Sequence, residues 1–224
     1  MPLNESKERV MVDVWDWQTR ALHWINALLI ITLALLMIGK EGMEILGVEK
    51  SVREPVKRLH AYLGYVFVFT FFIRVLWAFA GNKYARWSDI WPFKRDRLNA
   101  IARNIRWYLS GFKGRPADVV GHDPLASIFY VALFLVLLSQ AGTGIILAGA
   151  EFKMFPGSML LSGLGAQTVE ALKDALEEAH EAGLLFILFF LGAHLLGMIV
   201  HEVSEKNGLL SSMVHGKKYL RKDE

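Results

Sequence analysis

The 224-residue sequence contains no cysteine. This absence excludes disulfides, iron–sulfur clusters, zinc–thiolate sites and covalently attached c-type haem. Internal repeats, low-complexity tracts and strand-like alternation of polar and apolar residues are also missing. The net charge is only +3 and is unevenly distributed, so it indicates membrane topology rather than nucleic-acid binding. Hydrophobic residues make up 54% of the chain, which exceeds the roughly 45–50% of soluble proteins.

The hydrophobic excess is concentrated in four runs. Each run approaches the ~20 residues that a helix needs to cross a bilayer, and lipid favours helices because they satisfy their own backbone hydrogen bonds. Any single run could be a core helix of a soluble protein, but four together argue against that alternative. We therefore predict an all-α, integral membrane four-helix bundle that forms a single domain over residues 1–224. The predicted transmembrane helices are residues 21–38, 59–80, 125–148 and 179–201.

Lysine and arginine predict the orientation of these helices. Seventeen of these residues lie in the N-terminal tail, the connection 81–123 and the C-terminal tail, whereas seven lie in the other two connections. The positive-inside rule therefore places both termini and the connection 81–123 in the cytoplasm. Residues 97–109 of this connection have helical spacing and a basic face, which predicts an amphipathic helix on the inner leaflet. A solvated loop helix fits the same pattern.

Four histidines lie in or beside the predicted helices: His23, His60, His180 and His194. Ionisable residues in membrane helices are costly and usually functional. His180 and His194 are 14 residues apart, so they share a helix face and lie about 21 Å apart along the axis. Helix direction then places His60 level with His180 near the outer surface, and His23 level with His194 near the cytoplasmic surface.

Two histidine pairs at different depths predict two bis-histidine sites. Without cysteine or a nearby carboxylate, the natural occupant is a non-covalent haem whose iron takes both axial ligands from histidine. Such ligation leaves no open position for oxygen, so electron transfer is the expected task. Two alternatives stay open. Any single histidine could be a hydrogen-bonded core residue, and His201 faces the same way as His194 and could replace it as a ligand.

Short motifs run through nearly the whole chain in a fixed order. They are Arg20-Ala-Leu-His23-Trp24, His60 with Gly64, Arg74-Val-Leu-Trp77, Gly121-His122-Asp123-Pro124 and Gln140-Ala-Gly-Thr143-Gly144, followed by His180 and His194. In this order the chain resembles the cytochrome b subunit of membrane-bound nickel–iron hydrogenases. It also resembles the related cytochrome b subunits of formate dehydrogenase and thiosulfate reductase, which belong to the same superfamily of bacterial dihaem cytochromes b.

The resemblance implies a multi-pass protein of the bacterial inner membrane with two b-type haems. It implies that the first, second and fourth helices supply the iron ligands and the third supplies none. It also implies two partners, a catalytic or electron-carrying redox subunit on the outer face and a quinone, either menaquinone or ubiquinone. The chain is then an electron-transfer, quinone-reducing subunit of an oxidoreductase complex rather than a complete enzyme.

Five further residues are candidates for the same sites. His122 and Asp123 are quinone-site candidates, because His122 can deliver protons near neutral pH. The family usually has Asn at the position of Asp123. Asp123 could instead simply cap the helix that starts at Pro124. Arg20 and Arg58 could pair with haem propionates, or anchor the chain at lipid headgroups. Trp24 could line the inner haem or quinone region, or belong to an aromatic belt.

Two other functions compete with this interpretation. One is a freestanding, quinol-linked cytochrome b without a dedicated partner. The other is a non-redox membrane anchor or transporter that uses its histidines for metal or protons. Haem signals in an optical spectrum argue against the non-redox anchor or transporter. Co-purification with a redox subunit argues against the freestanding cytochrome.

Overall fold

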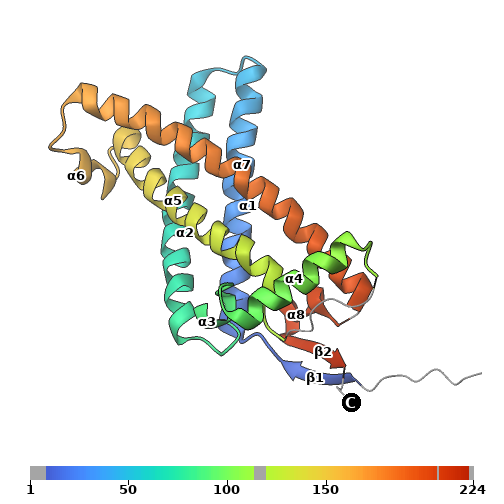
Figure 1. Ribbon diagram of the computed structural model, residues 1–224. Helices are drawn as coiled ribbons and strands as arrows, with labels where there is room; N and C mark the ends of the chain where they lie inside the picture. Colours follow the sequence, from blue (N-terminus) through green and yellow to red (C-terminus); the bar gives the residue numbers. More distant parts are fainter. Residues whose placement is uncertain (1–8, 114–119, 206, 222–224) are drawn as a thin grey trace, which may run out of the picture. The chain divides into compact units, whose positions relative to one another are not determined.

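The computed structural model describes residues 9–113, 120–205 and 207–221 (Figure 1). Four of the basic residues used to predict the topology, Lys7, Arg115, Lys206 and Lys222, lie outside this part of the chain. In chain order the elements are β1 (Arg9–Asp13), α1 (Trp17–Ile45), α2 (Lys50–Ala80), α3 (Trp87–Ile90), α4 (Arg95–Leu109), α5 (Pro124–Phe152), α6 (Gly157–Leu161), α7 (Ala166–Glu205), α8 (Leu209–His215) and β2 (Lys217–Arg221).

Four of these helices, α1, α2, α5 and α7, are long and apolar enough to cross a membrane. They contain the four predicted runs, which confirms the all-α membrane bundle. Most of their apolar side chains are not buried within the protein, as expected for helices whose outer faces contact lipid. Helix α7 begins at Ala166, well before its apolar run. The predicted amphipathic helix is also present as α4, which buries Ala100, Ile101, Asn104 and Trp107 and exposes its other face.

The chain divides into two compact units, and each is described by itself. Unit 1 comprises Met1–Ala21, Val75–Ala132 and Phe190–Glu224, and unit 2 comprises Leu22–Arg74 and Leu133–Phe189. Each long helix contributes a segment to both units. The His60 and His180 positions both fall in unit 2, whereas His122 and His194 fall in unit 1.

Segments of all four long helices pack together in unit 2. Thr70 of α2 donates a hydrogen bond to Asn26 of α1 (3.0 Å), and the rings of Phe71 and Phe134 join α2 to α5. Lys57 of α2 lies 3.4 Å from a carboxylate oxygen of Glu151 in α5 and 3.6 Å from one of Glu177 in α7. These contacts tie the helices together around the interior of the unit.

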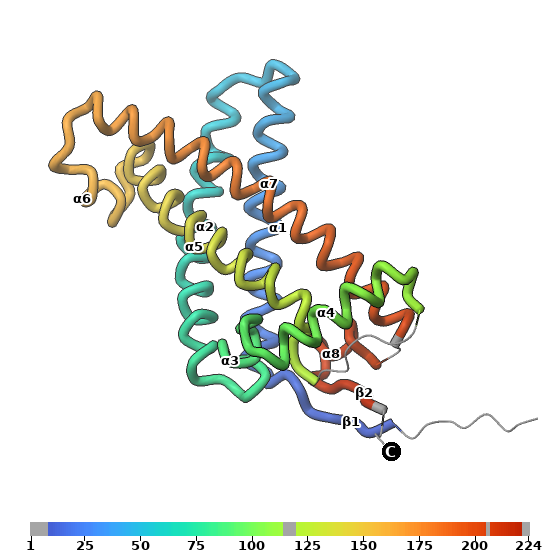
Figure 2. Tube along the Cα trace, viewed as in Figure 1, coloured from blue at the N-terminus to red at the C-terminus, as the bar shows by residue number. Residues whose placement is uncertain are grey.

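The connection between α5 and α7 folds back on the end of α5 (Figure 2). A Cβ atom at Gly157, the first residue of α6, would lie only 2.1 Å from the carbonyl oxygen of Ile145. A Cβ at Gly149 would meet the backbone of Gly157 at 2.2 Å. Glycine is therefore required on both sides of this contact.

Unit 1 contains a small sheet that was not predicted from the sequence. Strands β1 and β2 pair antiparallel, with Met11 opposite Tyr219, so they join the two ends of the described chain (Figure 1). Gly216 precedes β2 in the left-handed conformation (φ 87°), and its carbonyl oxygen accepts hydrogen bonds from the backbone of Val14 and Trp15. A side chain here would also meet the Trp15 carbonyl, so this junction needs glycine.

Candidate functional site

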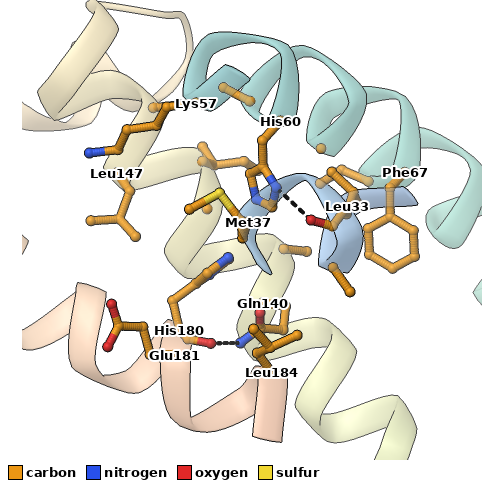
Figure 3. A pocket seen from close by; sticks show the side chains of 18 of the residues that line it. Leu33, Met37, Lys57, His60, Phe67, Gln140, Leu147, His180, Glu181 and Leu184 are labelled. Carbon is orange, nitrogen blue, oxygen red and sulfur yellow. Dashed lines mark hydrogen bonds between the residues drawn. The ribbon is translucent and has the colours of Figure 1, made fainter. Parts of the chain in front are cut away.

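His60 of α2 and His180 of α7 approach each other within unit 2. Their ring centroids are 6.2 Å apart and the ring planes are inclined at 76°. Both side chains point toward a shared space between the helices (Figure 3). The two residues that helix direction paired therefore lie close together, and their role as ligands of one iron stays a prediction.

Each of these imidazoles has an acceptor at Nδ1. His60 Nδ1 lies 3.1 Å from the carbonyl oxygen of Leu33 in α1, and a carbonyl can only accept. His180 Nδ1 lies 2.8 Å from the hydroxyl of Thr143 in α5. Nδ1 therefore carries the hydrogen in His60, which leaves Nε2 with a free lone pair. Metal-binding histidines usually have this arrangement, with the second ring nitrogen donating to an acceptor.

A cavity of about 270 Å³ lies beside the two histidines. This volume is more than ten times the roughly 15 Å³ that one buried water requires. Most lining residues are apolar and come from α1, α2, α5 and α7. The charged lining residues lie toward one end of the cavity, where α1 and α5 finish and α2 and α7 begin. They are Lys40, Glu41, Lys57, Glu151, Glu177 and Glu181.

The dimensions and chemistry of this site fit a haem. Two metal–imidazole bonds of about 2 Å, plus the distance from each nitrogen to its ring centre, give centroids roughly 6 Å apart. Gly64 and Gly144 line the cavity, and a Cβ added at Gly64 would meet nothing within 4 Å. The buried hydroxyl of Tyr65 lines it as well and has no hydrogen-bond partner among the described residues. An amphipathic ligand with a flat apolar body suits these surroundings.

The members of the other predicted histidine pair, His23 and His194, fall in different units. His23, in unit 2, packs edge-to-face against Trp24 with centroids 5.2 Å apart. His194, in unit 1, stacks on Phe190 at 5.6 Å and lies 6.2 Å from the ring of Tyr130. Their pairing stays a prediction.

His201, the alternative to His194, has a structural role in unit 1. It is buried, and its Nε2 lies 2.9 Å from the hydroxyl of Tyr108 in α4. Its ring also packs against Trp107. The amphipathic helix α4 is thereby fastened to the end of α7, and this use of Nε2 favours His194 as the ligand candidate.

The two predicted arginines have other contacts. Arg20 donates a hydrogen bond to the carbonyl oxygen of Val214 in α8. Arg58 lies over the ring of Phe152, 4.8 Å from its centroid, and Phe152 lines the cavity. Lys57, the preceding residue, lines the cavity directly, although sequence reasoning did not select it. Trp24 is 46% exposed, which suits the aromatic-belt alternative as well as a site role.

His122 belongs to a polar cluster in unit 1. Its backbone N–H and its Nδ1 lie 3.0 and 2.8 Å from one carboxylate oxygen of Asp89 in α3. Arg97 of α4 donates to the other Asp89 oxygen at 3.0 Å and to the His122 carbonyl at 3.1 Å. Burial raises the pKa of Asp89, but the hydrogen bonds from His122 and the nearby charges of His122 and Arg97 outweigh it, so the net shift is downward.

Lys218 of β2 holds the loop that carries His122. It is 3% exposed and donates to the carbonyl oxygens of Val120 and Gly121 at 2.9 and 3.0 Å. The ring of His122 also packs edge-to-face against Trp15 at 4.8 Å. Sequence reasoning missed Asp89, Arg97 and Lys218, because these residues come from three separate elements that meet only through tertiary packing.

Asp123 caps α5, as one of the two sequence-based alternatives predicted. One of its carboxylate oxygens accepts the backbone N–H of Ala126 at 2.8 Å, and the other accepts from Asn104 of α4 at 2.5 Å. Pro124 follows as the first residue of the helix. Both carboxylate oxygens are thus engaged, and the quinone role of Asp123 stays a prediction.

Comparison with known sequences identifies the family. The sequence profile of the prokaryotic cytochrome b561 family matches residues 14–216. This chain belongs to that family. The match spans both units and includes every histidine discussed above. Membership of this family makes the chain a membrane b-type cytochrome that functions in electron transfer. It also makes the chain a multi-pass protein of the bacterial inner membrane, in agreement with its four apolar helices.

Curated relatives in this cytochrome b561 family carry the name probable Ni/Fe-hydrogenase B-type cytochrome subunit. The Rhizobium leguminosarum bv. viciae protein is 28% identical, with 97% of this chain and 92% of the relative covered. The Cupriavidus necator protein is also 28% identical, covering 91% and 85%. The Escherichia coli K12 protein, named as the hydrogenase 1 subunit, is 25% identical, covering 91% and 88%.

These findings confirm the resemblance to the cytochrome b of nickel–iron hydrogenases. A b-type cytochrome holds haem non-covalently, in agreement with the absence of cysteine. The alternative of a non-redox anchor or transporter does not fit the cytochrome b561 family.

Proposed function

We propose that this cytochrome is a dihaem subunit that carries electrons between a hydrogenase on the outer face of the membrane and the quinone pool. The single observation that carries the proposal is the convergence of His60 and His180 on one apolar cavity. Their separation suits two axial ligands of one iron, and both imidazoles have acceptors at Nδ1 that orient them.

The residues around this cavity have distinct tasks toward the haem. His60 and His180 would provide the axial nitrogens, and Gly64 and Gly144 leave room for the flat ring. Lys40 and Lys57 line the charged end of the cavity and would be the cations available to haem propionates. Haem iron, when bound, supplies reversible one-electron chemistry. The apolar lining excludes water and so limits side reactions.

A second haem between His23 and His194 completes the proposal. The positive-inside rule predicts these two residues near the cytoplasmic surface and His60 and His180 near the outer surface. Two sites at different depths provide a route across the membrane that neither site provides alone. His122 then serves quinone reduction as a proton donor near the cytoplasmic face, and its Nδ1 contact with Asp89 orients the ring.

The hydrogenase partner is supported by the names of the relatives, each of which is a hydrogenase cytochrome subunit. This chain covers 85–92% of the length of those proteins. The freestanding quinol-linked cytochrome, the remaining alternative, has no observation that favours it here.

Hydrogen-dependent quinone reduction in membranes tests this function. Vesicles from cells that express the chain with its hydrogenase should reduce menaquinone or ubiquinone when hydrogen is added, and His180→Ala should abolish this reaction. The hydrogenase should still reduce a soluble dye such as methylene blue, because its own active site is untouched. Unchanged hydrogen-to-quinone electron transfer in His180→Ala, with the variant present at the wild-type level, would refute the proposal.

A further inference from the structure

We infer that Thr143 of α5 is a positioning residue for His180 and sets the redox potential of the outer haem. This inference rests on the proposed function, because it presumes that His60 and His180 hold a haem. It assigns a task to α5, the long helix that has no candidate ligand of its own. Thr143 is 8% exposed, and its hydroxyl lies 2.8 Å from His180 Nδ1.

The hydrogen bonds of Thr143 define the direction of this contact. Its hydroxyl lies 2.8 Å from the carbonyl oxygen of Ser139 and 3.3 Å from that of Gln140, and a hydroxyl has only one hydrogen to donate. With that hydrogen directed at the carbonyls, the Thr143 oxygen accepts from His180 Nδ1–H. His180 then holds its hydrogen on Nδ1 and presents the Nε2 lone pair as the ligand.

The backbone of His180 is also fixed from α5. Gln140 Nε2 donates to the His180 carbonyl oxygen at 3.0 Å (Figure 3). Gly144 also faces the His180 ring, since a Cβ added there would lie 3.4 Å from it, at ordinary van der Waals contact. One turn of α5 thus holds both the main chain and the ring nitrogen of His180.

The two histidines of the pair differ in a way that can be tested. His60 donates to a main-chain carbonyl, which no substitution removes, whereas His180 donates to a side chain. An acceptor at Nδ1 makes a metal-bound imidazole a stronger electron donor, and that stabilises the oxidised iron. Loss of the Thr143 oxygen should therefore raise the midpoint potential of this haem and leave the other haem unchanged.

The experiment is a potentiometric titration of the purified full-length chain with its haems, followed at the α-band. Thr143→Val should move one of the two transitions to higher potential, and Thr143→Ser should restore the wild-type position. Thr70→Val is the matched control, because the Thr70 hydroxyl, in the same unit, bonds Asn26 and the Phe67 carbonyl rather than either histidine of the His60–His180 pair. Its titration should match the wild type.

Each outcome distinguishes this inference from the function it rests on. A wild-type chain without haem would refute the proposed function itself. A wild-type chain with two haems and a Thr143→Val titration that superimposes on it would overturn only the role of Thr143. If Thr143→Val does not accumulate, Thr143→Ala and Thr143→Ser are compared, and equal potentials in these two variants would overturn the inference as well.

Discussion

At the scale of single residues, the polar cluster of unit 1 shows how a partly buried carboxylate stabilises a loop. Asp89 accepts hydrogen bonds from the main chain and ring of His122 and from Arg97. It is also packed closely against Gly121, where an added Cβ would lie 2.4 Å from a carboxylate oxygen. Together with Lys218, Asp89 therefore holds the loop before α5.

Asp89→Asn should destabilise unit 1 by about 2 kcal/mol at neutral pH, since hydrogen bonds to a charged group are lost. The pKa of Asp89 is lowered in the folded chain. Its stabilising effect is therefore complete above the unfolded pKa of about 3.9 and is lost as the pH falls through the lower folded value. Thermal unfolding in detergent should show a wild-type advantage at neutral pH that closes in acid.

The control for this prediction is Asp96→Asn, because Asp96 is exposed in the first turn of α4. It should change the unfolding temperature little at any pH. An Asp89→Asn variant as stable as the wild type at neutral pH would show that the cluster does not hold the loop.

The histidine pair was predictable at this scale, whereas its acceptors were not. Helix direction and depth were enough to pair His60 with His180, because a membrane restricts helices to two directions. The acceptors Leu33 and Thr143 depend on the rotation of α1 and α5 about their axes, and the nearly uniform apolar sequence of these helices does not specify that rotation. Asp89 was missed for a similar reason, since it meets His122 only through tertiary packing.

At the scale of elements, the contact between α5 and α6 depends on two glycines. Gly157→Ala would place a Cβ against the Ile145 carbonyl, where the neighbouring atoms are backbone and cannot move aside cheaply. Overpacking of this kind costs about 1–3 kcal/mol. Thermal unfolding should therefore show a clear loss of stability in Gly157→Ala.

Gly163→Ala provides the matched control for this pair of elements. Gly163 lies in the same connection, but a Cβ there would meet nothing within 4 Å, and its φ is not in the left-handed region. The substitution should be neutral or slightly stabilising. Equal losses in both variants would mean that the tight approach of α6 to α5 does not contribute to stability.

Elements differed in how far they could be predicted. The four membrane helices and α4 follow from length, apolarity and helical spacing, which are local properties. Strands β1 and β2 have five residues each and lie about 200 residues apart in the chain, so their pairing leaves no local signal. Helix α7 begins at Ala166, whereas the predicted span, which followed the apolar run, began only at residue 179.

At the scale of the whole molecule, the proposed electron route requires a defined orientation in the membrane. The positive-inside rule predicts cytoplasmic termini, a cytoplasmic connection between α2 and α5, and an outer connection between α5 and α7. Because the natural chain has no cysteine, single cysteines can be introduced and labelled without background.

Lys113→Cys and Gly163→Cys test this orientation in intact cells. Both positions are exposed. A membrane-impermeant maleimide should label Gly163→Cys from outside and should label Lys113→Cys only after the cells are opened. The opposite pattern would invert the topology and place the His60–His180 site on the cytoplasmic side.

The most direct test of the whole account is the haem-to-protein ratio of the purified chain. We predict two b-type haems per wild-type chain and one in either His60→Ala or His180→Ala. Substitution of His215 in α8, whose Nδ1 accepts the Lys217 backbone N–H, should leave both haems in place. Retention of both haems in His60→Ala and His180→Ala would contradict the assignment of these residues as the ligands of one iron.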